Sequence, residues 1–285
     1  MKHILIGIDF SPASVNAFDY AARMAVAYGS RLTLVHAYQP AMLEPYVDHG
    51  MEAALLKQQE KIALTHFARL KDHLPTRIKS YLTFEFRIEL GVPTETLLRL
   101  SKEVSPDLIV IGAQGGNPLM KRLLGSTAQT MIQRAEYPLL LIPEEAKFHE
   151  FSRIAYATDY KEDDIRVIDD VLYFAKQNHA KLTCVHVRDK ASIKEAYQQE
   201  LLKRTYYYDL THANIDFETI THDNVVEGLQ HYMEWEQINM MVMLTHHRNR
   251  IEQLFHKSHC KQLSLQTDVP LWIYPMNQDK APLTL

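Results

Sequence analysis

The feature that most constrains the fold is an internal repeat that covers both halves of this 285-residue chain. Residues 2–37 align without gaps to residues 152–187 at an offset of 150 positions. Residues 107–143 align to residues 239–275 at an offset of 132, so the first copy carries 18 extra residues. A chain of this length suits two domains that each bury a core, and the repeat therefore predicts two homologous units.

The repeat also predicts where the units meet. The copies join near residues 144–151, and we expect a first domain over residues 1–146 and a second over residues 147–285. The 18-residue insertion is placed most simply around residues 39–53, ahead of the second helix.

Within each unit, apolar runs typical of buried parallel strands alternate with helical segments. Ser11 and Pro12 suit the N-cap and first position of a helix that Gly29 would end. With right-handed crossovers, this pattern predicts an α/β protein with two tandem doubly wound five-stranded parallel-sheet domains of Rossmann-like form. The expected strands are 3–9, 31–36, 81–88, 107–112, 138–142, 153–158, 181–187, 215–220, 239–244 and 270–274; the expected helices of the first unit are 12–28, 51–73, 93–104 and 126–136.

Small residues lie between the fourth strand and the following helix of the first unit: Gly112, Gly115, Gly125 and Ser126. Glycines at such a turn can take positive φ and let the backbone approach a phosphate, while the helix N-terminus favours negative charge. Lys121 in the same loop would add positive charge, as would Arg122. The alternative is a turn whose glycines only allow the chain to change direction.

The doubly wound order would bring Asp9, at the end of the first strand, to the same crevice as the glycine loop. The alternative for Asp9 is a helix-capping or turn aspartate. His36 ends the second strand and is interpreted as a core or strand-end histidine rather than a ligand contact.

Several classes of function are disfavoured. The segment after Asp9 has no G-x-G-x-x-G motif, which disfavours a dinucleotide such as NAD or FAD. No Lys followed by Ser or Thr completes a P-loop in the glycine loop, which excludes a standard P-loop NTPase. A net charge of −4 without a long basic run disfavours nucleic acid as a partner, and no apolar stretch is long enough to span a bilayer. The strand-like start without a signal peptide, and only two cysteines, favour a cytoplasmic protein.

The spacing Gly112-x2-Gly115-x9-Gly125-Ser126, with Asp9 after the first strand, resembles the ATP-binding class of the universal stress protein family, and the chain looks like a tandem member of it. The resemblance implies bound ATP, often with a divalent ion such as Mg²⁺ on its phosphates. It also implies that the last strands of the two units, 139–142 and 271–274, pair as in a dimer, and a homodimer is a further possibility. The residues implied to contact the nucleotide are Asp9, Ala37, Gly112, Gly115, Gly125, Ser126 and Thr127.

The second unit departs from the motif at every glycine, because Leu244, His247 and Lys257 replace Gly112, Gly115 and Gly125. We therefore expect one nucleotide per chain, in the first domain. The same loop holds a histidine-rich group for which ordinary surface residues are favoured over a metal site, because its spacing matches no established zinc pattern. Its members are His246, His247, His256, His259 and Cys260.

Three hypotheses on function follow. The first is a regulatory ATP-binding protein of the stress response. The second is a slow ATPase, which is weakened because Asp9 is the only evident carboxylate near the loop and no general base accompanies it. The third is an interaction module that binds no nucleotide and uses the second domain or residues 39–53 as its partner surface.

Overall fold

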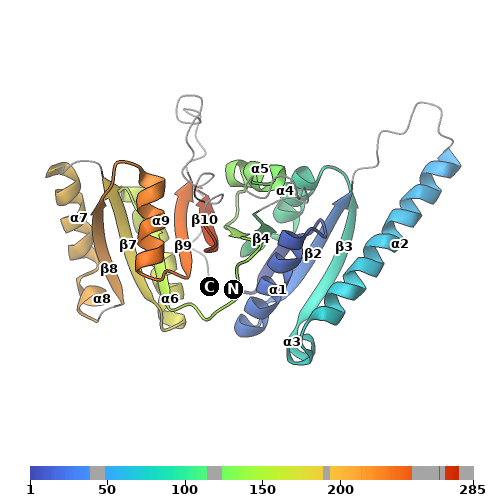
Figure 1. The fold of residues 1–285 in the computed structure, drawn as a ribbon, viewed down its shortest axis with the longest axis horizontal. Helices are drawn as coiled ribbons and strands as arrows, with labels where there is room; N and C mark the ends of the chain where they lie inside the picture. The colour runs from blue at the N-terminus through green and yellow to red at the C-terminus, as the bar shows by residue number, and fades with distance from the viewer. Residues whose placement is uncertain are drawn as a thin grey trace.

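The computed structural model describes residues 1–38, 49–113, 124–188, 193–212, 214–245, 263 and 267–275. Helices cover both faces of one ten-stranded sheet (Figure 1). The first half contains β1 (His3–Gly7), α1 (Pro12–Tyr28), β2 (Arg31–Tyr38), α2 (His49–His73), α3 (Thr76–Tyr81), β3 (Thr83–Leu90), α4 (Pro93–Val104), β4 (Leu108–Gly112), α5 (Ser126–Arg134) and β5 (Leu139–Ile142). The second half contains β6 (Arg153–Ala157), α6 (Glu162–Gln177), β7 (Lys181–Arg188), α7 (Ile193–Thr205), α8 (Tyr207–Thr211), β8 (Ile215–Thr221), α9 (Val225–Trp235), β9 (Met240–Thr245) and β10 (Leu271–Pro275).

Both halves have the same doubly wound topology. The strand order is β3-β2-β1-β4-β5 in the first half, and the second half follows the equivalent order β8-β7-β6-β9-β10. All neighbouring strands within a half pair in parallel. The predicted fold class, two tandem five-stranded parallel sheets, is confirmed.

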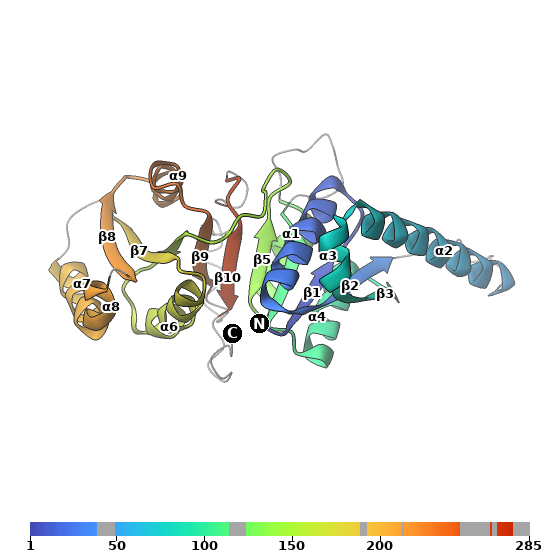
Figure 2. The ribbon, with the colours of Figure 1, turned by 90° about the horizontal axis from the view of Figure 1, so that it is seen from below.

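Buried apolar residues alternate between two cores, one on each face of the sheet, because successive strand side chains point to opposite faces. Ile4 and Ile6 lie in the core under α1, α2 and α6, whereas Leu5 and Ile109 lie in the core under α4, α5 and α9. Figure 2 shows helices on both sides of the central strands. Burial on both faces explains the continuous apolar runs of the strands.

The start of the first half follows local sequence signals closely. Ser11 caps α1 by accepting a hydrogen bond from the Ser14 amide, and Gly29 ends the helix with φ of +64°. β1 ends at Gly7, two residues before the predicted end, so Asp9 lies in the turn and not in the strand. The short helices α3 and α8, which directly precede β3 and β8, were not predicted.

The insertion in the first half lengthens a helix as well as a connection. α2 has 25 residues and its counterpart α7 has 13, so twelve of the 18 extra residues belong to the helix and six to residues 39–48. The prediction that the insertion lies wholly ahead of α2 is therefore wrong. Among the helices of the described residues, α2 included, none is both long and apolar enough to cross a membrane.

The two halves meet through equivalent residues. β5 and β10 pair antiparallel, with Leu140 opposite Trp272, its repeat counterpart (Figure 2). On one face of this pair, the Tyr28 hydroxyl donates a hydrogen bond to the side-chain carbonyl of Asn178, which is again its counterpart. Two self-matching contacts define a pseudo-twofold axis, as in an isologous dimer interface. The predicted pairing of residues 139–142 with 271–274 is confirmed.

The segment between β5 and β6 is packed against both halves. Asn16 on α1 donates hydrogen bonds of 2.8 Å to the carbonyl oxygens of Pro143 and Ala146. Phe151 is almost fully buried, and its ring lies 5.3 Å from that of Phe174 on α6. The connection thus adds to the core at the junction.

Candidate functional site

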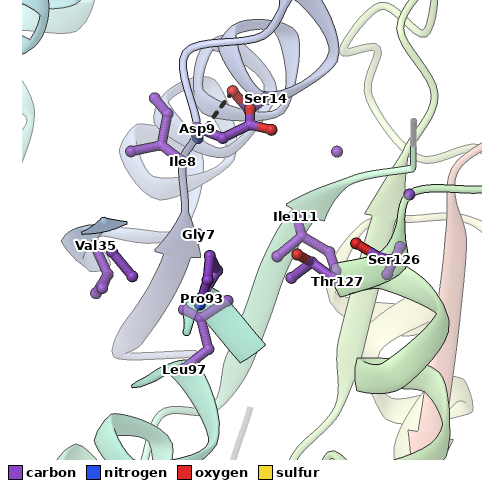
Figure 3. A pocket seen from close by; sticks show the side chains of 14 residues that line it. Gly7, Ile8, Asp9, Ser14, Val35, Pro93, Leu97, Ile111, Ser126 and Thr127 are labelled. Carbon is purple, nitrogen blue, oxygen red and sulfur yellow. Dashed lines mark hydrogen bonds between the residues drawn. The ribbon is translucent and has the colours of Figure 1, made fainter. Parts of the chain in front are cut away.

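A cavity of about 200 Å³ opens at the carboxyl ends of β1 and β4, where the winding of the sheet reverses (Figure 3). Six of the seven predicted site residues line it, and the seventh, Gly115, lies outside the described residues, as do Lys121 and Arg122. The lining residues are Gly7, Ile8, Asp9, Ser14, Val35, Ala37, Pro93, Leu97, Ile111, Gly112, Gly125, Ser126, Thr127 and Ala128.

Asp9 has a structural role on one side of its carboxylate. Its Oδ1 atom accepts hydrogen bonds from the Ser11 amide at 2.9 Å and the Ser11 hydroxyl at 2.5 Å. The turn-aspartate alternative is thus confirmed for this oxygen. Oδ2 has no hydrogen-bond partner among the described residues, and the side chain is exposed at the cavity rim. The turn therefore orients the carboxylate and leaves one oxygen available to a ligand.

The N-terminus of α5 forms the opposite side of the cavity, and Ser126 and Thr127 lie there in Figure 3. Its N-cap, Gly125, has no side chain that could accept hydrogen bonds from the first-turn amides. The Gly125 amide itself donates a hydrogen bond to the Ala113 carbonyl at 3.0 Å. The first N–H groups of an α-helix have no partner within the helix, and the helix dipole places partial positive charge there. This end of the cavity is therefore suited to an anion.

Gly112 has a packing role that the sequence analysis did not identify. Gly125 has φ of −59°, and among the described glycines only Gly29 and Gly91 have positive φ. Gly112 and Gly125 therefore do not use the positive φ that glycine can take. A Cβ on Gly112 would lie 2.7 Å from the Ala13 backbone carbon, so this glycine lets the start of α1 approach the end of β4.

An apolar wall completes the cavity, formed by side chains that the sequence analysis did not identify: Val35, Pro93, Leu97 and Ile111. Val35 lies in β2 opposite Gly7, Ile111 lies near the end of β4, and Pro93 and Leu97 lie in the first turns of α4 (Figure 3). Gly7 leaves room for this wall, because a Cβ there would lie 2.7 Å from Leu97 Cδ1. Position in the doubly wound order was the signal that could have revealed them.

His36 and Phe10 link the Asp9 turn to α2. The Nδ1 atom of His36 lies 2.9 Å from the Ile8 carbonyl oxygen, which supports the interpretation of His36 as a strand-end residue. Phe10 has φ of +62°, an uncommon value for a bulky residue, and its ring lies 4.8 Å from that of His66 on α2. The turn, the second strand and α2 are therefore packed as one unit.

The equivalent positions of the second half carry other side chains. Ala157 replaces Gly7, Val187 replaces Ala37, and Met243, which is longer and unbranched, replaces Ile111. Leu244 stands at the position of Gly112, as the sequence analysis noted. The remaining replacements His247 and Lys257, and the group His246, His247, His256, His259 and Cys260, lie outside the described residues.

A buried carboxylate stands where the first half has Ser14. Asp164 accepts hydrogen bonds from the Tyr156 hydroxyl at 2.7 Å and the Thr158 hydroxyl at 2.5 Å. It also accepts from the Lys161 amide at the start of α6, at 3.0 Å. Burial, together with the Asp164 charge, raises the pKa of Tyr156 well above its usual value. Asp164 thus supplies a fixed internal anion beside the start of α6. Within the described residues, no three His, Cys, Asp or Glu side chains gather closely enough to hold a metal ion.

Comparison with known proteins agrees with the repeat. The model of the universal stress protein family matches residues 1–143 and again residues 150–275. A universal stress protein of Thermus aquaticus is 30% identical over 148 residues, which cover 50% of this chain and 98% of that protein. Universal stress protein A homolog 1 of Coxiella burnetii is 28% identical over 150 residues, 50% of this chain and 95% of its own.

One solved structure shares the complete two-unit fold. The crystal structure of a universal stress protein from Archaeoglobus fulgidus covers 98% of this chain and 97% of its own, with a TM-score of 0.74 and 13% identity. Relatives of single-unit length therefore match one half, and a longer chain matches both.

Proposed function

The chain belongs to the universal stress protein family, and we propose that it is a regulatory protein of the stress response that binds one ATP per chain, in the first half. The observation that carries this proposal is the cavity that joins the exposed Asp9 carboxylate to the uncapped N-terminus of α5. A carboxylate can accept hydrogen bonds from ribose hydroxyls, and a helix N-terminus binds phosphate. These groups fit the two polar parts of a nucleotide.

The apolar wall suits the remaining part of the ligand. Val35, Pro93 and Leu97 offer a surface against which a purine can be buried, as in most small-molecule sites. We propose that Ala37 contacts the base or ribose and that Gly112, Gly115, Gly125, Ser126 and Thr127 hold the phosphates. An accompanying Mg²⁺ would then be carried mainly by phosphate oxygens, since Asp9 is the sole carboxylate among the lining residues.

The second half is proposed to lack a nucleotide. Larger side chains replace Gly7, Gly112 and Ala37 there, and Asp164 adds a buried negative charge. We assign the nucleotide to a domain over residues 1–146 and the empty counterpart to residues 147–285. A cytoplasmic location and the absence of a nucleic-acid partner stay predictions.

The first experiment is to denature freshly purified protein and to count the released nucleotides by chromatography and mass spectrometry. We expect about one ATP or ADP per chain, reduced at least tenfold in Asp9→Ala. Asp159→Ala removes the equivalent exposed aspartate of the second half and serves as the matched control, with unchanged occupancy. No nucleotide in the wild type, and none bound after ATP and Mg²⁺ are added, would refute the proposal and favour the interaction-module hypothesis.

A further inference from the structure

A buried polar cluster in the second half has no part in the proposed nucleotide site. It lies where the turn after β6, the end of β7 and the first turns of α7 meet. Aromatic side chains occupy the equivalent place in the first half, where Phe10 packs against His36 and Phe67. The polar cluster consists of Thr158, Tyr160, His186, Glu195, Gln199 and Thr219.

The protonation of His186 is constrained by its neighbours. Its Nδ1 atom lies 2.8 Å from the Thr158 carbonyl oxygen, which can only accept, so Nδ1 carries a hydrogen. The Nε2 atom is buried and has no hydrogen-bond partner among the described residues. It faces Oε2 of Glu195, on the first turn of α7, at 3.6 Å, and the His186 side chain is only 8% exposed.

The character of this contact depends on one proton. When His186 is neutral, the Nε2 lone pair faces a carboxylate oxygen, and two acceptors cannot form a hydrogen bond. When a proton binds to Nε2, the imidazolium becomes a donor to Glu195 and the pair becomes a charge-assisted hydrogen bond. Histidine is the side chain that ordinarily changes charge between pH 5 and 8.

A second anchor of α7 lies one turn away and does not titrate. The side-chain amide of Gln199 donates to the Tyr160 hydroxyl at 2.9 Å and to the Thr219 hydroxyl at 3.2 Å. Burial raises the pKa of Tyr160 to about 12, so this phenol remains neutral near physiological pH. The Gln199 anchor therefore holds the helix at all pH values at which His186 changes charge.

Among the described residues, two further charged groups lie near His186. Arg188 lies two positions along β7, on the same face of the strand. Asp164 on α6 accepts a hydrogen bond from the Thr158 hydroxyl. The Glu218 carboxylate interacts with Tyr232 instead, on the opposite face of β8.

We infer that the His186–Glu195 pair is a pH-sensitive latch, which docks the first turn of α7 when His186 is protonated and loosens it when His186 is neutral. The second half would thereby respond to proton concentration at the end of the sheet where the first half is proposed to respond to nucleotide. This latch does not depend on nucleotide binding.

The test is hydrogen–deuterium exchange of the full-length protein at pH 6 and pH 8, with labelling times corrected for the intrinsic exchange rate. We expect the protection of peptides covering residues 193–200 to be about threefold lower at pH 8 than at pH 6. A change of this size corresponds to the loss of one partly exposed ion pair. Glu195→Gln should abolish this difference, because an amide can donate to neutral Nε2. Glu200→Gln on the same helix removes an exposed charge and should behave like the wild type.

Equal protection at both pH values in the wild type would overturn the inference, as would a persistent pH effect in Glu195→Gln. His186→Asn provides a second route, because its amide can still donate to the Thr158 carbonyl but cannot titrate. A pH effect that survives in His186→Asn would also exclude the latch.

Discussion

The two halves have the same strand order, yet the carboxyl ends of their sheets carry different side chains. In the first half, Gly7 and Gly112 remove side chains from the carboxyl ends of β1 and β4, and a cavity remains. In the second half, Ala157 and Leu244 occupy the equivalent positions, and Asp164 contributes a carboxylate of its own. The same fold therefore presents a different surface at this end of each sheet.

The comparison also concerns stability, because empty space and unpaired buried amides both destabilise a fold. The second half carries Ala157, Val187 and Leu244 at the positions of Gly7, Ala37 and Gly112, and Asp164 accepts a hydrogen bond from the Lys161 amide. Four tests measure how far this difference extends.

The largest expected effect is at the junction, where equivalent residues meet but differ in size. Trp272→Ala should lower the free energy of unfolding by about 4 kcal/mol and Leu140→Ala by about 3 kcal/mol, because both are fully buried and leave cavities. Urea denaturation followed by circular dichroism measures both. A loss below about 1 kcal/mol for either variant would show that the halves do not depend on this contact.

The next test compares Asp164 with its counterpart Ser14. Asp164→Ala leaves the hydroxyls of Tyr156 and Thr158 without their acceptor, so we expect a loss of about 3 kcal/mol in unfolding free energy. Ser14→Ala removes two longer hydrogen bonds, from its hydroxyl to the Ser11 carbonyl at 3.1 Å and from the Asp9 amide to its hydroxyl at 3.4 Å, and should cost about 1 kcal/mol. Equal losses in the same denaturation assay would mean that the buried carboxylate has no special role.

The third test concerns Gly112. Gly112→Ala should destabilise the protein by about 2 kcal/mol, because the new Cβ meets the backbone of Ala13, and should also reduce retained nucleotide. Gly7→Ala is the control within the same cavity, and its effect should be smaller because its Cβ meets the flexible end of Leu97. Thermal unfolding and nucleotide counting give both quantities. A larger effect at Gly7 would contradict this order.

The smallest expected effect is a pH dependence of the free energy of unfolding that comes from His3 in the first half. His3 is buried, its Nε2 bonds Thr33 at 2.8 Å, and its repeat counterpart is Arg153. Burial, and then the charge of Arg31, lowers the pKa of His3. The unfolded chain therefore takes up a proton that the folded chain refuses, so stability present above about pH 6.5 is lost as the pH falls toward the lowered pKa.

Denaturation midpoints at pH 7.5, 6.5 and 5.5 measure how steeply stability falls with pH. His3→Gln should flatten this slope, because glutamine cannot titrate but can still donate to Thr33. The charged groups nearest to His3 besides Arg31 are Asp107 and Glu85, and both oppose the shift. An unchanged slope in His3→Gln would assign the acid sensitivity to other residues.

Much of the fold could be predicted because its signals are local. α1 was predicted from residue 12 to residue 28, since Ser11, Pro12 and Gly29 determine its ends through their own backbone preferences. The ends of other elements were less certain. β1 stops at Gly7, and the start of α2 at His49 reassigns part of the insertion to a helix.

The candidate site was predictable only in part. Asp9 and the glycines stood out by residue type and position, but Val35, Pro93 and Leu97 resemble any other apolar residues in the sequence. The reason for Gly112 was also hidden, because it depends on a contact with Ala13, about 100 positions away in the chain.

The sequence by itself determined that this protein has two related α/β units, that one keeps a glycine loop, and that the other has lost it. Repeats, strand periodicity and glycine spacing are properties of neighbouring residues, and they survive without knowledge of packing. Only the tertiary structure decided that Leu140 meets Trp272, that Asp164 collects three donors, and that His186 faces Glu195. These contacts depend on distances between elements that are set by close packing of the whole chain, so no local pattern encodes them.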